Sequence, residues 1–317
     1  MRASISVFAL VLAGLPACDG CARPSTRTEA LADASAPLAV VDAASALAIA
    51  DATSPLALPN GCTSLDPFVY LIGAPPQEHA AIALYRFAPA TGETTRMAVL
   101  ACEPFSIAVD RAGVFWASGY DGRLFTIDSS TGACHATAFA KGQRGFDTFH
   151  LAFASVPGSA SETLFASDEH DSHGDPAPSK GLASIDRSAL RLVPIGKYEA
   201  KTSFEDAPCS LAGTGDGRLF AQCPGQELWL ASQHPDPTKI SLARVADTTD
   251  WLPRFSIRPF AFFGGALWFF PHPCDTGNCE EGSHVTRFDL ATKFVRADVT
   301  VLPLIVSAAT TSTCAPL

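Results

Sequence analysis

The strongest constraint on the fold is a pattern of short strands that recurs in groups of four. Runs of β-branched and aromatic residues alternate with turns rich in Gly, Pro, Asp and Ser roughly every 8 to 12 residues. The first group reads "FSIAVD", "GVFWAS", "RLFTID" and "CHATAFA" between Phe105 and Ala140. Four such groups begin near residues 105, 150, 209 and 257, so the repeat is about 45 to 59 residues long.

A repeat of this length predicts an all-β protein, and specifically a β-propeller. A four-stranded sheet cannot bury both of its faces alone, so each sheet must stack on its neighbours in a ring. No long helical pattern interrupts the series. The alternatives are a ring of six blades, with a degenerate blade inside the long third segment, and a β-sandwich.

The two ends of the chain complete one further blade. Three strand patterns, "FVYLIG", "IALYRF" and "TRMAVLA", precede the first group, and one, "LPLIVSAA", follows the last. Three plus one strands give a fifth blade, in which the C-terminal strand would lie innermost beside Phe68 to Ile72. Such closure leaves no exposed strand edge between the first and last blades.

The pentapeptide "DGRLF" occurs twice, at Asp121 to Phe125 and at Asp216 to Phe220. In the first group it forms the turn into the third strand, but in the third group it forms the turn into the second. Asp-Gly supplies the positive φ that tight turns need, and Arg-Leu-Phe begins an alternating strand. The duplicated motif therefore predicts hairpin architecture and no chemistry.

The N-terminal residues have the features of an export signal. A positive charge at Arg2 precedes an apolar run from Ile5 to Leu15, which is too short to span a membrane. The following "LPAC" resembles the bacterial lipoprotein box, in which Cys18 would carry lipid. Pro16 departs from that pattern, so ordinary secretion is the alternative. The expected location is extracytoplasmic, with a lipid anchor in a bacterial membrane facing the periplasm or the cell surface.

The segment after Cys18 has the composition of a tether. From Ala22 to Gly61 the chain is rich in Ala, Ser, Thr, Pro and Asp and contains no aromatic residue, so it buries too little apolar surface to offset its ordering entropy. The expected organisation is a signal peptide over 1–17, a lipidated cysteine and disordered linker over 18–61, and a propeller over 62–317.

The number of cysteines supports an exported folded domain that is cross-linked by disulfides. Eight cysteines remain when Cys18 and Cys21 are excluded, and an even number in an exported protein predicts four disulfides. The predicted pairs are Cys62 with Cys314, Cys209 with Cys223, Cys274 with Cys279, and Cys102 with Cys134. The pairing of Cys102 with Cys134 is the weakest prediction, because the expected strand directions place these two residues on opposite faces of the ring.

The phrases "FSIAVDRAGVFWAS" and "RLFTIDSSTG" resemble the repeats of bacterial extracytoplasmic propellers of the NHL and gluconolactonase-like kind, many of which are lipoproteins. The resemblance covers the chain from about Pro67 to Pro316. It implies a central channel and a ligand face. That face is built by the loops between each blade's last strand and the next blade's first, and by the loops between second and third strands. A shared fold does not assign a function.

The resemblance also implies a test for catalysis. Gluconolactonase-like enzymes hold a divalent cation with Glu, Asp and Asn side chains of inner strands, but the body has a single Asn, Asn278, in a loop. The expected inner strands carry no carboxylate except Asp110 at one end, which also disfavours a glycosidase. We therefore expect a non-catalytic ligand- or protein-binding or scaffold lipoprotein of the cell envelope. The alternative is a metal-dependent hydrolase or lactonase-like propeller enzyme.

The expected partners follow from the net charge of the chain and from its expected cellular location. A formal net charge of −10 without a basic patch argues against nucleic acid. The membrane is contacted through the lipid anchor only. An envelope protein, or a small-molecule or glycan ligand, would occupy the ligand face.

Polar residues gather in two loops of that face, "SDEHDSHGDPAPSKG" and "PHPCDTGNCEEGSH". Imidazole and carboxylate suit zinc and similar divalent ions, so a metal such as zinc or calcium is the one cofactor that these loops suggest. Solvated loops made polar for solubility are the alternative. The candidate ligands are His170, His173, His272 and His284.

Four further residues belong to the candidate ligand face. His79 and His150 lie on the same expected side of the ring. Trp251 and Arg254 lie in "TTDWLPRF", the connector to the fifth blade. The Trp251 ring could stack on a ligand at the channel mouth or fill the edge of a blade.

Overall fold

The computed structural model describes residues 58–77, 80–169, 179–199, 209–223, 227–233, 239–249, 251–252, 259–272 and 282–317. The predicted signal peptide and most of the predicted linker lie outside these residues. So do seven predicted site residues, namely Cys18, His79, His170, His173, Arg254, Cys274 and Cys279.

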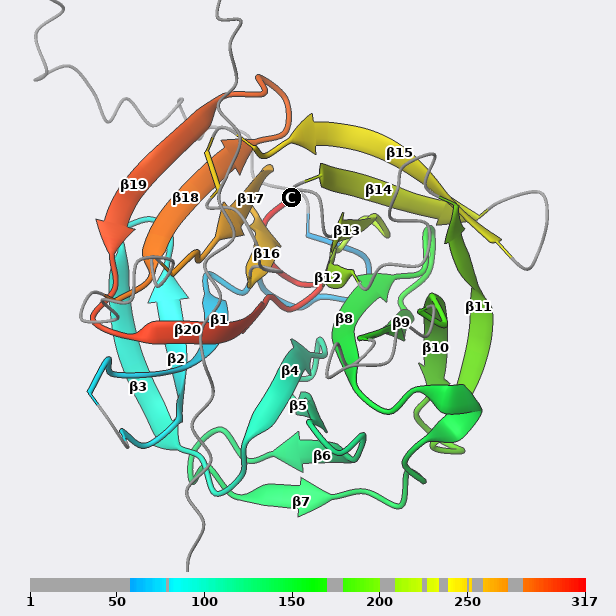
Figure 1. Cartoon of the computed structure of the whole chain (residues 1–317). Helices are drawn as coiled ribbons and strands as arrows, with labels where there is room; N and C mark the ends of the chain where they lie inside the picture. Colours follow the sequence, from blue (N-terminus) through cyan, green and yellow to red (C-terminus); the bar gives the residue numbers. More distant parts are fainter. Residues whose placement is uncertain are drawn as a thin grey trace, which may run out of the picture. The chain divides into compact units, whose positions relative to one another are not determined.

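The described strands form five four-stranded antiparallel sheets, the blades of a propeller (Figure 1). Blade 1 contains β20 (Ile305–Thr310), β1 (Val69–Ala74), β2 (Ala83–Ala88) and β3 (Glu93–Val99). Blade 2 contains β4 (Pro104–Val109), β5 (Phe115–Gly119), β6 (Leu124–Ile127) and β7 (Cys134–Ala136). A short 3-10 turn, η1 (Gln143–Gly145), precedes blade 3.

The remaining strands complete the ring. Blade 3 contains β8 (Phe149–Ser155), β9 (Glu162–Asp168), β10 (Leu182–Asp186) and β11 (Arg191–Glu199). Blade 4 contains β12 (Ser210–Gly213), β13 (Leu219–Cys223), β14 (Glu227–Gln233) and β15 (Lys239–Asp247). Blade 5 contains β16 (Phe260–Phe263), β17 (Ala266–Phe269), β18 (His284–Asp289) and β19 (Val295–Val301). The predicted all-β propeller is confirmed. Among the described residues, no helix is long and apolar enough to span a bilayer.

The C-terminal strand closes the ring as the sequence predicts. β20 pairs antiparallel with β1, with Leu71 opposite Ala309 and Tyr70 opposite Thr310. The first strand of each blade contacts the first strand of the next, from β20 through β4, β8, β12 and β16 and back to β20. These five strands therefore surround a central channel, while the fourth strands lie along the rim (Figure 1).

Five apolar clusters fill the five interfaces between neighbouring blades, one cluster per interface. Aromatic rings mark several of them. Phe87 of blade 1 meets Trp268 of blade 5 at 5.8 Å between ring centroids, and Tyr70 meets Phe115 of blade 2 at 4.9 Å. The core is therefore divided among the interfaces, which is why each blade depends on its neighbours.

Blades 3 and 4 are joined by an additional backbone seam that the sequence pattern did not predict. β11 pairs in parallel with β15, with Lys197 opposite Lys239 and Glu199 opposite Ser241. The two blades thus form one continuous eight-stranded sheet. Since both strands are the outermost of their blades, the pairing removes two exposed edges.

The hairpin between the third and fourth strands repeats in four blades. An amide donates to the carbonyl four residues earlier at Gly92, Gly132 and Lys293, and each of these residues has a positive φ, of 75°, 76° and 60°. Leu190 takes the same place in blade 3 with a φ of 49°. In blades 2, 3 and 5 an aspartate four residues earlier accepts hydrogen bonds from the turn. Those aspartates are Asp128, Asp186 and Asp289.

Both copies of "DGRLF" build the same local structure in different hairpins. Gly122 and Gly217 have φ values of 73° and 89°. In each copy the arginine pairs with the aspartate two residues earlier and lies over the phenylalanine two residues later. The motif is a self-contained turn, as predicted.

Both ends of the described chain close the mouth of the channel opposite the predicted ligand face. Ser312 and Thr313, which follow β20, contact the turns between first and second strands of neighbouring blades. The Pro316 carbonyl accepts a hydrogen bond from Gly264 in the equivalent turn of blade 5. Pro59 lies against Gly215 in that of blade 4. Residues 310–315 are buried, so this end of the channel is filled by protein.

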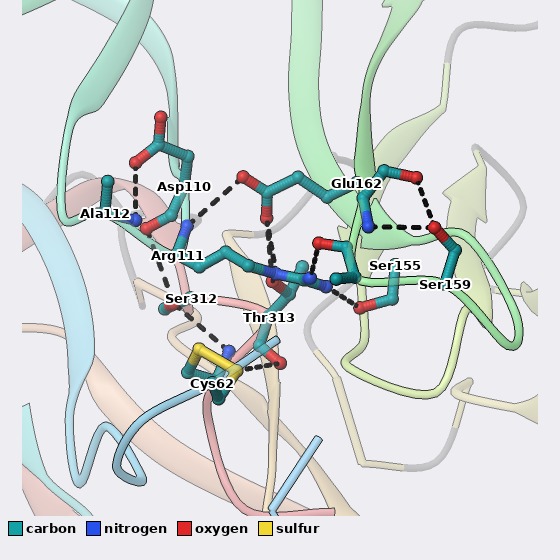
Figure 2. Close-up of polar contacts among 12 residues, drawn as sticks. Cys62, Asp110, Arg111, Ala112, Ser155, Ser159, Glu162, Ser312 and Thr313 are labelled. Atoms are coloured by element: carbon teal, nitrogen blue, oxygen red, sulfur yellow. Dashed lines mark hydrogen bonds and ion pairs between the residues drawn. A yellow bond between two sulfur atoms is a disulfide. The ribbon is translucent and has the colours of Figure 1, made fainter. Parts of the chain in front are cut away.

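A buried polar network holds the C-terminal segment there (Figure 2). The Arg111 guanidinium donates to Thr313 Oγ1 at 3.1 Å and to Ser155 Oγ at 2.6 Å. Glu162 accepts from Thr313 Oγ1 at 2.7 Å and from the Arg111 amide at 3.2 Å. Arg187 donates to Asp110 Oδ2 at 2.9 Å. Both buried carboxylates are therefore paired, and Asp110 has a structural role.

Three disulfides are present in the described part of the chain. Cys62 bonds Cys314, Cys209 bonds Cys223, and Cys102 bonds Cys134. The expectation that the last pair lies on opposite faces is wrong. The blades twist so strongly that their outer strands run along the rim (Figure 1), and the end of β3 therefore meets the start of β7. The Ala101 amide donates to the Gly132 carbonyl at 3.0 Å and fixes this approach.

Candidate functional site

The open end of the channel contains a small cavity lined by all five inner strands. Its volume is about 40 Å³, which is room for water molecules. The cavity lies at the ends where β4, β8, β12 and β16 begin, which is the predicted ligand face. The lining residues are Phe105, Ser106, His150, Ser210, Leu211, Pro259, Phe260 and Ser307 to Ala309.

The most reactive group of this lining is a histidine paired with a carboxylate. His150 Nε2 lies 3.0 Å from Glu169 Oε2. The side chains are 15% and 23% exposed, so both are shielded but reachable from solvent. In the neutral tautomer whose Nε2 donates to this carboxylate, Nδ1 is the acceptor nitrogen. Nδ1 makes no hydrogen bond to any described residue.

The local strand geometry brings this pair together. His150 is the second residue of β8 and lies opposite Ser167 of β9. The chain continues past β9 to Glu169, whose amide donates to the Thr148 carbonyl at 2.8 Å. This bond holds Glu169 diagonally across the hairpin from His150, within reach of its ring.

An aromatic row leads from the pair to the surface. The Phe105 ring lies 4.7 Å from the His150 ring and 5.2 Å from the Tyr120 ring, the latter in an edge-on arrangement. Tyr120 is 65% exposed. Its backbone carbonyl accepts a hydrogen bond from Thr148 Oγ1 at 3.1 Å, so its turn is tied to the segment that precedes β8.

The polar groups of the cavity are hydroxyls and one imidazole. Ser106 Oγ accepts a hydrogen bond from the Leu151 amide at 3.0 Å, and its hydroxyl hydrogen has no acceptor among the described residues. The inner strands supply no carboxylate to the lining. In the part of the chain that is described, no group of three or more His, Cys, Asp or Glu is placed to hold a metal ion. This donor set does not fit a divalent cation in the channel.

The other predicted site residues lie apart from the cavity. His272 and His284 occupy one blade 5 connection, where the His284 amide donates to the Pro271 carbonyl at 2.8 Å. Trp251 packs against Phe288, with ring centroids 5.5 Å apart, and edge-on against Phe269 at 5.3 Å. It therefore packs at the edge of a blade, which is the alternative that the sequence left open for this residue. The sequence did not single out Phe105, Tyr120 or the His150–Glu169 pairing.

Shifted pKa values occur away from this mouth. Burial raises the pKa of Asp66, whose carboxylate accepts from the Phe68 amide and the Tyr70 hydroxyl, each at 3.2 Å. Burial also raises the pKa of Tyr198, whose hydroxyl donates to Ser167 Oγ at 2.8 Å. Both groups have structural roles, because Asp66 lies at the closed end of the channel and Tyr198 lies between blades 3 and 4.

No protein-family model and no curated protein matches the chain. Among solved structures, a gluconolactonase from Xanthomonas campestris is similar at 12% identity, over 77% of this chain and 79% of that one, with a TM-score of 0.45. TolB from Acinetobacter baumannii is similar at 11% identity, over 76% and 56%, with a TM-score of 0.40. A 6-phosphogluconolactonase candidate from Bacteroides uniformis is similar at 13% identity, over 74% and 67%, with a TM-score of 0.33. Similarities of this size concern the fold alone.

The expectation of a non-catalytic binding or scaffold protein is corrected by these comparisons. Proteins of similar fold include structures named as gluconolactonases, and enzymes are therefore among its structural neighbours. The expectation rested on inner strands without carboxylates. It overlooked that Glu169, which follows the second strand of blade 3, reaches the inner-strand residue His150.

Proposed function

We propose that this chain is a hydrolase that opens a small lactone or a related ester at the open mouth of the channel. The observation that carries the proposal is the His150–Glu169 pair, 3.0 Å apart, whose histidine lines the cavity at this mouth. The similarity to gluconolactonases agrees with it but is too weak to add an argument.

The proposed reaction is general-base hydrolysis. Glu169 orients the imidazole through Nε2, which leaves Nδ1 of His150 to take a proton from a water molecule in the cavity. The water oxygen attacks the ester carbonyl, the bond from the carbonyl carbon to the ring oxygen breaks, and the proton passes to that oxygen. The product is a hydroxy acid.

In the proposed reaction the Ser106 hydroxyl assists the carbonyl. Its oxygen is occupied by the Leu151 amide, so its hydrogen is the part that remains to donate. A donor aimed at a developing oxyanion stabilises the transition state more than the ground state. The mechanism derived from these residues uses no metal ion.

The test compares two histidines in one assay. His150→Gln should lower kcat for δ-valerolactone and glucono-1,5-lactone roughly 10²- to 10⁴-fold, the usual contribution of a positioned base. His135→Gln is the matched control, because His135 is exposed on β7, away from the cavity. The rate would be followed by acid release above the spontaneous background. Equal rates for the two variants, or no hydrolysis by the unmutated protein, would contradict the proposal.

We also propose that the enzyme is held outside the cytoplasm by lipid on Cys18. The three disulfides are typical of extracytoplasmic proteins, and the "LPAC" sequence ending at Cys18 supports lipidation. Mass spectrometry of the mature N-terminus checks this, since a chain processed elsewhere would carry no lipid mass.

A further inference from the structure

We infer that the closed face of the propeller contacts the surface of a lipid bilayer. This face comprises the turns between first and second strands of blades 2 to 5, together with the two ends of the described chain that pack on them. The inference rests on the proposed lipid at Cys18, which brings a bilayer near, and is independent of the proposed hydrolase. Four apolar side chains of the closed face are 38% to 47% exposed, namely Leu58, Val114, Val156 and Leu317.

Two of the exposed side chains lie on turns that are bonded to each other. Val114 belongs to the blade 2 turn, between β4 and β5, and Val156 belongs to the blade 3 turn, between β8 and β9. The Arg111 guanidinium of the blade 2 turn donates to the Ala160 carbonyl of the blade 3 turn. The two valines therefore belong to one continuous surface.

Both ends of the described chain join the same surface. The glycines of the blade 4 turn lie against Pro59 and Pro157, which stand next to two of the exposed side chains. The carbonyl of Pro316, next to Leu317, accepts a hydrogen bond from the blade 5 turn. The four apolar side chains are thus spread over adjacent turns of one face, an arrangement typical of a contact surface.

The ionic groups of these turns are paired within the protein. Charged groups that already have partners lose less on leaving bulk water than unpaired groups do. Each pair is neutral, so it gives the face no attraction to anionic headgroups, and apolar burial drives the contact. The pairs, with nitrogen–oxygen distances of 3.6, 2.9 and 2.9 Å, are Arg111–Glu162, Arg187–Asp110 and Arg218–Asp216.

A bilayer fits this surface better than a folded protein partner does. At four glycines of these turns an added Cβ atom would meet no heavy atom within 4 Å beyond its chain neighbours, so the turn tips project from the face. A protein partner would need a shape complementary to several separate tips, whereas the fluid interface of a bilayer accepts an apolar side chain at each position. The glycines are Gly113, Gly158, Gly264 and Gly265.

The path of the chain gives the closed face a high local concentration of lipid. Leu58 is the first described residue, and residues 19–57 link it to Cys18. A lipid on Cys18 makes the contact intramolecular, so that even a weak surface is occupied through its effective concentration. Because Leu58 is itself one of the exposed side chains, the tether joins the fold at the contact surface.

The experiment measures which face meets the acyl chains. The full mature chain is reconstituted in phosphatidylcholine vesicles with and without brominated acyl chains, which quench tryptophan on contact. Val156→Trp places a new indole on the closed face. Tyr120→Trp is the matched control, since Tyr120 is 65% exposed at the open mouth. Bromine should remove fluorescence from Val156→Trp that Tyr120→Trp and the unmutated protein keep. Equal fluorescence losses in all three would overturn the inference.

A second comparison tests the apolar nature of the contact. Adding Leu58→Ser and Val114→Ser to Val156→Trp should diminish the quenching. Val99→Ser with Val301→Ser should leave it unchanged, because these valines, 46% and 51% exposed, lie on outer strands. High salt should also leave the quenching unchanged, since the charges of the face are paired. Quenching that disappears in high salt would overturn the apolar contact.

The tether and the face are tested apart. A full chain with Cys18→Ser, mixed with excess vesicles, presents the closed face without lipid on the protein. Quenching of Val156→Trp in this form supports the contact even if Cys18 carries no lipid, and no quenching in either form disproves it. Lactone hydrolysis is assayed separately and bears on the hydrolase alone. If Val156→Trp fails to fold, Val114→Trp on the neighbouring turn replaces it.

Discussion

At the residue scale, Asp66 is held where its charge is poorly solvated. Burial raises its pKa above 3.8, against the opposing effect of two hydrogen bonds. For a carboxyl with a raised folded-state pKa, the associated stability is fully present below the unfolded pKa and is lost as pH rises through the folded value. Ionised Asp66 therefore destabilises the fold at neutral pH.

Asp66→Asn should raise the melting temperature at pH 7 and leave it nearly unchanged at pH 3. The amide oxygen still accepts from Phe68 and Tyr70, so only the charge is removed. Asp186→Asn is a control of opposite sign, since hydrogen bonds to Ser188 and Ala189 lower the pKa of Asp186. That variant should lose stability at neutral pH and not in acid. Thermal melts at both pH values measure this, and a gain for Asp66→Asn confined to pH 3 would disprove it.

Single residues also show the limit of prediction for the site. His150 could be placed on the open face from its position at the start of an inner strand. Its pairing with Glu169 required the register of the β8–β9 hairpin and the bond from Glu169 to the Thr148 carbonyl. Residues 148 and 169 are equally far from the centre of the turn between β8 and β9, and this spacing could have predicted that they lie opposite each other. The polar residues after Glu169 suggested a metal-binding loop instead.

At the element scale, the hairpin between third and fourth strands contains a strained position. Gly92 and Gly132 adopt a positive φ without steric cost, whereas Leu190 and Lys293 do so as residues with a Cβ, with φ of 49° and 60°. A left-handed conformation costs a non-glycine residue about 1–2 kcal/mol. Replacing it by glycine relieves this cost but adds about 0.5–1 kcal/mol of unfolded-state entropy.

Lys293→Gly should therefore be more stable than Lys293→Ala by about 1 kcal/mol. Both variants remove the Lys293 ammonium from the Phe288 ring, which it approaches to 5.8 Å, so their difference isolates the backbone. Urea unfolding of both variants gives the comparison. An alanine variant as stable as the glycine variant would show that the turn relaxes without strain.

The elements also show which part of the architecture the sequence could supply. Strand positions and the C-terminal closure follow from local alternation and turn residues, so β20 beside β1 was predictable. The Cys102–Cys134 geometry and the β11–β15 seam depend on blade twist, which accumulates across a sheet and leaves no local pattern.

At the scale of the whole molecule, the Cys62–Cys314 bond joins the two ends of the ring across a sequence separation of 252 residues. The Cys209–Cys223 bond spans a separation of 14. In the chain-entropy account, a disulfide restricts the unfolded chain more when its loop is longer. This bond therefore adds to the β20–β1 pairing and to the polar network of Arg111 and Glu162 in closing the ring.

Replacing Cys62 and Cys314 by Ala should lower the free energy of unfolding by about 5 kcal/mol, against about 3 kcal/mol for the same change at Cys209 and Cys223. Guanidinium unfolding without reductant compares the two double variants. Equal losses would mean that loop length does not set the contribution of these two bonds.

Both ends of the described chain fill one mouth of the channel. This arrangement determines where another molecule can be attached to the protein. Leu58 and Leu317 both belong to the face opposite the His150 cavity, as the contacts of Pro59 and Pro316 show. A reporter, an affinity handle or a solid support joined at Leu58 or Leu317 would therefore leave the mouth with the His150 cavity unobstructed. Attachment at these positions would orient the immobilised molecule with the His150 cavity facing away from the support.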